Sequence, residues 1–456
     1  ELPIRQGLAY ERELFQQCMK SPQREGLIHA FFGERKVARI PGLENVEPRA
    51  INTVGVIGGG TMGAGICVAL MNASIAVTMI ERDENTAQSG KNNVDRILEG
   101  GVKRGKLSPQ NKAQMLNDLF AVSTDYADLA KADLVIEAAY EDMEVKKQIF
   151  AELDRVCKPG AVLATNTSYL DINEIAASTS RPQDVLGLHF FSPANLMRLL
   201  EVVVADKTAD DTVATAFALA KRLRKVAVRA GVCDGFIGNR ILSAYLKCAD
   251  FMVLDGVSPF EIDKALVEFG YPMGPFAVSD LAGLDIGWAK RKRLAPTRDP
   301  EIRYAEFSDR ICEQGWFGRK TGKGFYLYDK GFNAPEPNPA VMEIIARERK
   351  EKGYRDRHIS RKEIVRRYLA AMINEAAKVV GDKTAQRPID VDMVFLFGYG
   401  FPRFRGGPLK YADMYGLEKV LADIKEFSCS DSKYWKPAPL LLELVNKHGK
   451  FDDLNG

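Results

Sequence analysis

The stretch Val56-Ile57-Gly58-Gly59-Gly60-Thr61-Met62-Gly63 determines the expected fold of this sequence more directly than any other part. It follows a β-rich run, begins a helix-like segment, and contains the pattern Gly-x-Gly-x-x-Gly. Gly58 permits a tight turn, Gly60 lets the backbone approach a phosphate, and Gly63 lets the helix pack against the strand. Unpaired N–H groups at the helix start attract an anion. The pattern predicts a dinucleotide-binding Rossmann turn; a glycine-rich turn without a ligand is the alternative.

An acidic residue follows the next β-rich run, Ile75–Ile80. Glu81 stands about where a Rossmann domain places the carboxylate that accepts hydrogen bonds from the ribose 2′-OH. A carboxylate there would repel a 2′-phosphate, so we expect NAD as the cofactor. The neighbouring Arg82 keeps NADP open as an alternative.

Strand-like and helix-like segments alternate from residue 51 to about residue 230, which predicts a mostly parallel, doubly wound sheet covered by helices. We therefore expect an α/β Rossmann domain over residues 51–230. The strand candidates after the first two are Leu134–Ile136, Val162–Thr165, Val185–Leu188 and Glu201–Val204.

Helical patterns replace the strands beyond residue 230, and a sequence of turns occurs twice. The segment Gly270–Leu284 contains Gly-Tyr-Pro, Gly-Pro and Asp-Leu-Ala-Gly-Leu, and Gly400–Leu417 contains Gly-Phe-Pro, Gly-Gly-Pro and Asp-Met-Tyr-Gly-Leu. Matching order and spacing predict a duplicated all-α domain, with copies over residues 231–330 and 331–456. Chance recurrence of turn residues is the alternative.

Residues 1–50 are expected to form one amphipathic helix and a basic linker. Leu8, Leu14, Phe15 and Met19 recur at near-helical spacing, and Ser21-Pro22 breaks the run. An apolar patch and then the linker follow. Such a segment needs another surface on which to bury its apolar face.

The composition is that of an ordinary globular protein. Of 456 residues, 46% are hydrophobic and 27% charged, and the net charge of +3 excludes a basic nucleic-acid footprint. No apolar run is long enough to span a bilayer, so we expect no membrane partner. Seven scattered cysteines suggest reduced thiols and no metal site. The last residues spell no peroxisomal address, which favours a cytoplasmic location.

Among the four histidines, only His189 is placed for chemistry. It ends a β-rich run, at the sheet edge where doubly wound folds bind ligands, and a neutral imidazole is a suitable base for an alcohol. Glu201 begins the next apolar run, where a carboxylate needs a partner and could orient the imidazole. Ser168 and Asn239 could donate hydrogen bonds to a substrate. Packing or surface positions for His189 and Glu201, a turn for Ser168 and a helix cap for Asn239 are the alternatives.

Taken together, these motifs resemble L-3-hydroxyacyl-CoA dehydrogenases, and the similarity extends over essentially the whole chain. The resemblance is carried by the glycine loop, Glu141–Lys146, Asn166–Ser168, His189–Pro193, Glu201, Gly235–Arg240 and Gly318–Tyr326. It implies NAD-dependent oxidation of an (S)-3-hydroxyacyl-CoA to the 3-ketoacyl-CoA.

The resemblance also implies a role for each matching residue. His189 would be the general base and Glu201 its partner, with Ser168 and Asn239 as substrate contacts. The implied cofactor contacts are Gly58, Gly60, Met62, Gly63, Glu81, Glu141, Lys146, Ser168 and Ser192, the last replacing an asparagine common in bacterial relatives.

The duplicated helical part narrows the resemblance to the multifunctional enzymes of fatty-acid β-oxidation, in which an enoyl-CoA hydratase domain precedes the dehydrogenase. Residues 1–50 resemble the linker helix of that family, which implies that a hydratase domain is missing here. The second helical copy would mimic the dimer partner of shorter relatives, so a monomer with an internal pseudo-dimer is expected. A short-chain 3-hydroxybutyryl-CoA dehydrogenase and a non-catalytic, crystallin-like structural protein are the alternatives.

Overall fold

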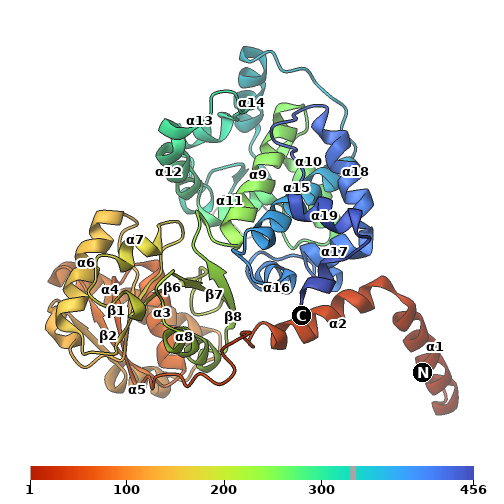
Figure 1. Cartoon of the computed structure of the whole chain (residues 1–456). Helices are drawn as coiled ribbons and strands as arrows, with labels where there is room; N and C mark the ends of the chain where they lie inside the picture. The colour runs from red at the N-terminus through yellow and green to blue at the C-terminus, as the bar shows by residue number, and fades with distance from the viewer. Residues whose placement is uncertain (1, 329–334) are drawn as a thin grey trace.

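A computed structural model describes residues 2–328 and 335–456 of the chain. Figure 1 shows a sheet covered by helices in the first half of the chain, a larger helical body in the second, and an N-terminal arm that reaches the helical body. Within the described residues no helix combines the length and the apolarity that crossing a membrane requires.

The sheet has eight strands in the order β3-β2-β1-β4-β5-β6-β7-β8. Neighbouring strands are parallel except β6 and β7, which are antiparallel. This confirms the predicted Rossmann fold. The strands are β1 (Thr53–Ile57), β2 (Ala76–Ile80), β3 (Phe120–Ser123), β4 (Leu134–Glu137), β5 (Val162–Thr165), β6 (Val185–Phe190), β7 (Leu199–Val204) and β8 (Val226–Gly231).

Both edge strands, β3 and β8, were missed by the strand prediction. Every residue of β3 is at least partly exposed, and Arg229 interrupts the apolar run of β8. Central strands are buried on both faces and form continuous apolar runs, which are easier to recognise. The helices of this domain are α3 (Thr61–Asn72), α4 (Glu84–Lys103), α5 (Pro109–Asp118), α6 (Met143–Val156), α7 (Ile172–Ala176) and α8 (Asp210–Arg222).

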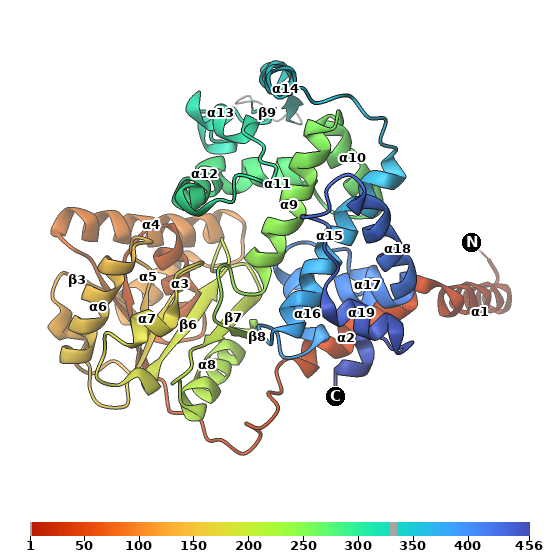
Figure 2. The ribbon, with the colours of Figure 1, turned by 45° about the horizontal axis from the view of Figure 1, so that its top comes forward.

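The helical body begins with α9, which stands between the sheet and the other helices (Figure 2). A short hairpin, β9 (Tyr326–Leu327) with β10 (Glu336–Pro337), lies between the two copies in sequence. The helices are α9 (Gly238–Leu254), α10 (Pro259–Phe269), α11 (Pro275–Ala282), α12 (Leu284–Leu294), α13 (Phe307–Glu313), α14 (Pro339–Glu351), α15 (Arg361–Gly381), α16 (Pro388–Gly398), α17 (Pro408–Tyr415), α18 (Leu417–Ser428) and α19 (Pro439–Asn446).

Equivalent residues of the two copies adopt the same local structure, which confirms the predicted duplication. Gly283 and Gly416, which each end one helix and start the next, have φ/ψ of 103°/115° and 103°/120°. Such positive φ values favour glycine. The carboxylate of Asp263 accepts hydrogen bonds from two backbone N–H groups at the start of α11, and the carboxylate of Asp392 does the same at the start of α17.

The N-terminal segment forms two helices, so the expectation of one helix followed by a linker is wrong. The helices are α1 (Ile4–Lys20), none of whose residues is buried, and α2 (Pro22–Lys36), which includes the predicted apolar patch. Proline in the first turn of a helix is favourable, so Ser21-Pro22 both ends α1 and starts α2. On α2, His29 Nε2 lies 2.8 Å from Asp392 Oδ2, while Phe32 remains 60% exposed.

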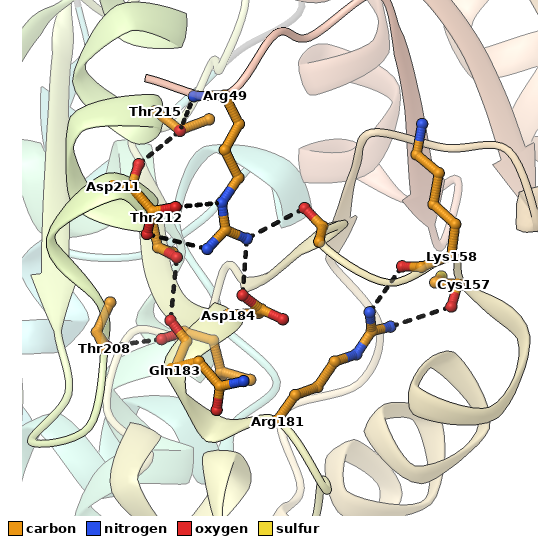
Figure 3. Close-up of polar contacts among 12 residues, drawn as sticks. Arg49, Cys157, Lys158, Arg181, Gln183, Asp184, Thr208, Asp211, Thr212 and Thr215 are labelled. Carbon is orange, nitrogen blue, oxygen red and sulfur yellow. Dashed lines mark hydrogen bonds and ion pairs between the residues drawn. The ribbon is translucent and has the colours of Figure 1, made fainter. Parts of the chain in front are cut away.

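Arg49 ties the linker after α2 to the Rossmann domain (Figure 3). Its guanidinium binds both carboxylate oxygens of Asp211, at 2.8 and 3.0 Å, and one oxygen of the buried Asp184 at 2.7 Å. Its backbone N–H donates to Thr215 Oγ1. Only arginine offers this fork of donors, so lysine could not replace it.

Replacing Arg49 with alanine is expected to lower the free energy of unfolding by about 2 kcal/mol, because the buried Asp184 carboxylate loses its charged partner. Denaturant unfolding of the whole chain measures the change. Arg82→Ala is the matched control, since Arg82 is largely exposed and pairs with Asp83 at the surface, where a pair contributes at most about 1 kcal/mol. Equal, small losses for both variants would contradict the prediction.

Candidate active site

The glycine turn between β1 and α3 has the geometry that a dinucleotide pyrophosphate requires. Gly58 has a φ of +94°, and a side-chain carbon there would lie 2.8 Å from the carbonyl oxygen of Ala138. A side-chain carbon at Gly63 would collide with the carbonyl oxygen of Gly58. Gly60, in contrast, faces open space, and no side chain caps the N-terminus of α3. The turn therefore leaves the N–H groups at the start of α3 available to a phosphate.

Glu81 follows β2 and accepts a hydrogen bond of 2.5 Å from the N–H of Gly59. Its carboxylate thus lies beside the glycine turn, where a ribose would follow the pyrophosphate. Met62, in the first turn of α3, is half-buried and packs against the sheet core. The residues present fit a dinucleotide cofactor.

His189 and Glu201 are direct cross-strand neighbours on β6 and β7. His189 Nδ1 lies 2.7 Å from Glu201 Oε2, and the two side chains are 5% and 0% exposed. A carboxylate on Nδ1 holds the tautomer whose Nε2 carries no proton. The antiparallel pairing therefore leaves the imidazole with an unprotonated Nε2 that can accept a hydrogen bond.

The second oxygen of Glu201 accepts a hydrogen bond of 2.9 Å from the N–H of Gly238, the first residue of α9. One buried carboxylate therefore joins the imidazole to the helical body. Sequence reasoning missed this contact of Gly238, because a backbone donor carries no residue signature.

Ser168 lies in the loop after β5, and its Oγ is 3.2 Å from His189 Nε2. Its backbone N–H donates to Glu141 Oε1, which also accepts from Thr167 Oγ1. The half-buried hydroxyl of Ser168 thus lies on the side of the imidazole where a substrate alcohol would meet Nε2.

Asn239 occupies the first turn of α9, next to Gly238. Its Oδ1 accepts a hydrogen bond of 2.9 Å from the hydroxyl of Tyr399, which follows α16 in the second helical copy. The structure therefore joins Ser168, His189 and Glu201 by direct contacts and places Asn239 beside Gly238. Tyr399 was not predicted from sequence, because it lies 160 positions from its partner.

Lys146 is 1% exposed, and both oxygens of the buried Glu137 accept from its Nζ, at 2.7 and 2.9 Å. A second carboxylate, that of Glu141, lies 3.4 Å from the same nitrogen. Glu137, at the end of β4, also accepts from Thr165 Oγ1 and was not among the predicted residues. Lys146 thus supports the loop of Glu141 from inside the protein.

Replacing Lys146 with methionine is expected to cost about 3–5 kcal/mol of stability, because Glu137 would remain buried without a cation. Thermal and denaturant unfolding measure the loss. Lys147→Met is the neighbouring control: Lys147 is half-buried and pairs with more exposed glutamates, so it should cost no more than about 1 kcal/mol. A Lys146 variant as stable as the Lys147 variant would contradict this account.

Ser192 is exposed, in the loop between β6 and β7. Lys225 holds the same loop by donating to the carbonyl oxygens of Ala194 and Met197, at 2.7 and 2.6 Å. Burial lowers the pKa of Lys225 to about 8. As the pH rises through about 8, the ammonium therefore loses its proton and, with it, part of its hold on the loop.

Comparison with known proteins gives two family matches in sequence order. Residues 53–233 match the 3-hydroxyacyl-CoA dehydrogenase NAD binding domain, and residues 235–328 and 364–455 match the C-terminal domain of the same family. The solved structure of FadB2 from M. tuberculosis is 40% identical, with a TM-score of 0.58, and the match covers 62% of this chain and 100% of FadB2. The chain belongs to the 3-hydroxyacyl-CoA dehydrogenase family.

Two further relatives match nearly all of this chain. The peroxisomal bifunctional enzyme of Danio rerio is 43% identical over 97% of the chain, and the chain spans 64% of that enzyme's length. The dehydrogenase part of multifunctional enzyme 1 from C. elegans is 28% identical, with a TM-score of 0.67, over 91% of this chain and 96% of that one. Both helical copies lie within these matches.

Proposed function

We propose that this chain oxidises the 3-hydroxyl group of an (S)-3-hydroxyacyl-CoA to a ketone, with NAD as the cofactor, in fatty-acid β-oxidation. The observation that carries the proposal is the placement of His189 between Glu201, at 2.7 Å, and Ser168, at 3.2 Å. These residues lie at the same end of the sheet as the glycine turn, where the parallel strands have their carboxyl ends. Ligands of doubly wound sheets bind at this edge.

In the proposed reaction, His189 Nε2 takes the proton of the substrate hydroxyl while Ser168 orients that hydroxyl. Glu201 stabilises the imidazolium that forms, and its fixed contact with Gly238 prevents the ring from turning. Asn239 donates to the thioester carbonyl from the helical body. Two domains thus hold the alcohol and the carbonyl, and this orientation lowers the entropy cost of the reaction.

The NAD-binding residues in this proposal are Gly58, Gly60 and Gly63 for the pyrophosphate and Glu81 for the adenosine ribose, with Met62 beside the turn. The bound nicotinamide would accept the hydride that leaves C3. Glu81 favours NAD over NADP, since its carboxylate would repel a 2′-phosphate. Glu141, Lys146, Ser168 and Ser192 are proposed for the nicotinamide end, with Lys146 acting through Glu141.

The test is NADH oxidation by the purified chain with 3-ketoacyl-CoAs from four to sixteen carbons, compared with NADPH. We expect activity across chain lengths and a strong preference for NADH. Activity confined to acetoacetyl-CoA would favour the short-chain dehydrogenase. NADH binding without turnover of any thioester would favour the structural, crystallin-like alternative.

The domain organisation forms part of the proposal. We propose a linker segment over 1–50, a Rossmann domain over 51–230, and helical copies over 231–330 and 331–456. The linker is proposed to bind a hydratase domain, consistent with the extra length of the bifunctional relatives. Light scattering after size exclusion would test the proposed monomer, and mixing with a separately expressed hydratase domain would test the linker.

The cellular compartment remains a prediction. The location expected in the sequence analysis is the cytoplasm, whereas the bifunctional relatives are named peroxisomal enzymes. Imaging of the complete gene product against markers of both compartments would decide between them.

A further inference from the structure

Tyr399 reaches the active site from the second helical copy. Its ring centroid lies 5.6 Å from that of Phe191, and the Phe191 ring lies 4.5 Å from the imidazole of His189. Its hydroxyl donates to Asn239 Oδ1 at 2.9 Å. A residue of the second copy thus contacts both the loop after β6 and a proposed substrate-binding residue of the first copy.

The position of the Tyr399 ring is fixed on several sides. The ring stacks on Phe395 of α16, with centroids 4.9 Å apart and planes 25° apart. In the first copy, any side-chain carbon at Gly238 would collide with the Tyr399 ring. Packing of this kind selects one rotamer, so the hydroxyl is held where Asn239 meets it.

The Tyr399 hydroxyl keeps its proton. Burial raises the pKa of Tyr399 well above its ordinary value of 10, and the nearby Glu201 carboxylate acts in the same direction. A protonated hydroxyl donates to the carbonyl end of a carboxamide, and Asn239 then has its N–H group free on the other side.

We propose that Tyr399 is a positioning residue: its hydroxyl holds the Asn239 carboxamide so that the Nδ2–H group faces the carbonyl of the acyl-CoA. The inference rests on the proposed function, because it concerns how that substrate is oriented. It gives the second helical copy a direct part in the reaction of the first.

The duplication provides an internal comparison. In the aligned turns, Phe269-Gly270-Tyr271-Pro272 of the first copy corresponds to Tyr399-Gly400-Phe401-Pro402 of the second. Phe269 is buried and packs against Tyr271, Phe401 and Tyr411 without a hydroxyl group. This turn therefore does not require a hydroxyl group for folding. We infer that the hydroxyl group of Tyr399 serves the contact with Asn239.

The first experiment compares Tyr399→Phe with Tyr271→Phe, since each variant introduces the residue that the other copy carries. Tyr399→Phe should lower kcat/KM for acetoacetyl-CoA about tenfold, with the KM for NADH and the melting temperature unchanged. Tyr271→Phe should retain wild-type activity, because among the described residues the Tyr271 hydroxyl has a hydrogen-bond contact only with Met372 Sδ, at 3.8 Å. A Tyr399 variant as active as the Tyr271 control would overturn the proposal.

A double-mutant cycle separates positioning from general support of the site. Asn239→Ala should lower kcat/KM on the order of 100-fold, and adding Tyr399→Phe should then cost nothing further. Additive losses would overturn the proposal. Asn239→Asp keeps the acceptor for Tyr399 but has no N–H, so it should be as impaired as Asn239→Ala; retained activity would also overturn it. Failure of the wild-type chain to turn over any 3-ketoacyl-CoA would overturn the proposed function itself and this inference with it.

Discussion

Replacing His189 with alanine is expected to lower kcat on the order of 1,000-fold, while NADH binding remains nearly unchanged. A positioned general base contributes about 10²- to 10⁴-fold to proton transfer, and within reach of Ser168 the described residues offer no second imidazole. The glycine turn and Glu81 lie on other strands and keep their geometry. Steady-state rates with acetoacetyl-CoA, together with NADH fluorescence titration, measure the two effects separately.

His448→Ala is the matched control for this variant, because His448 is a largely exposed histidine near the end of the chain and should not affect kcat. Loss of both NADH binding and turnover in the His189 variant would point to a structural role for His189. Full activity would remove His189 from the mechanism.

Replacing Glu201 with glutamine is expected to lower kcat about 10³-fold, although the side chain keeps its shape. Both oxygens of Glu201 accept hydrogen bonds, one from His189 and one from Gly238. A glutamine has one acceptor, so its NH₂ group must face one of these donors. The variant therefore either turns the imidazole into the wrong tautomer, which leaves Nε2 protonated, or loosens the start of α9.

Two measurements distinguish these consequences of Glu201→Gln. The wrong tautomer reduces kcat with little change in unfolding, whereas loss of the Gly238 contact costs about 1–3 kcal/mol of stability. Glu152→Gln is the control, since Glu152 forms a surface pair with Arg155 one helical turn away. Wild-type kcat in the Glu201 variant would contradict the proposed role.

The sequence was sufficient to predict the Rossmann domain, because alternating apolar runs and a glycine pattern are local signals. His189 and Glu201 could also be singled out from the sequence, because a polar side chain within an apolar run is costly to bury unless it has a partner. Their register, in contrast, depends on an antiparallel hairpin that no local pattern specifies. Glu137 was missed although it directly follows the predicted strand Leu134–Ile136. Its partner Lys146 lies on a different element, and the sequence does not show that the two residues meet.

The helical domain shows a different limit. Repeated glycine and proline positions predicted the duplication, because equivalent glycines and prolines form equivalent turns in the two copies. The contact of Tyr399 with Asn239 depends on how the second copy packs against α9 of the first, and no spacing within one copy encodes that arrangement.

Fusion of two helical copies in one chain removes a constraint that symmetry imposes on homodimers. In a dimer related by a twofold axis, each substitution enters both halves, so a tyrosine that supports one half would also alter the packing of the other. Here position 269 has phenylalanine and position 399 has tyrosine. The covalent link allows the two halves to differ at this position, and dilution cannot separate them.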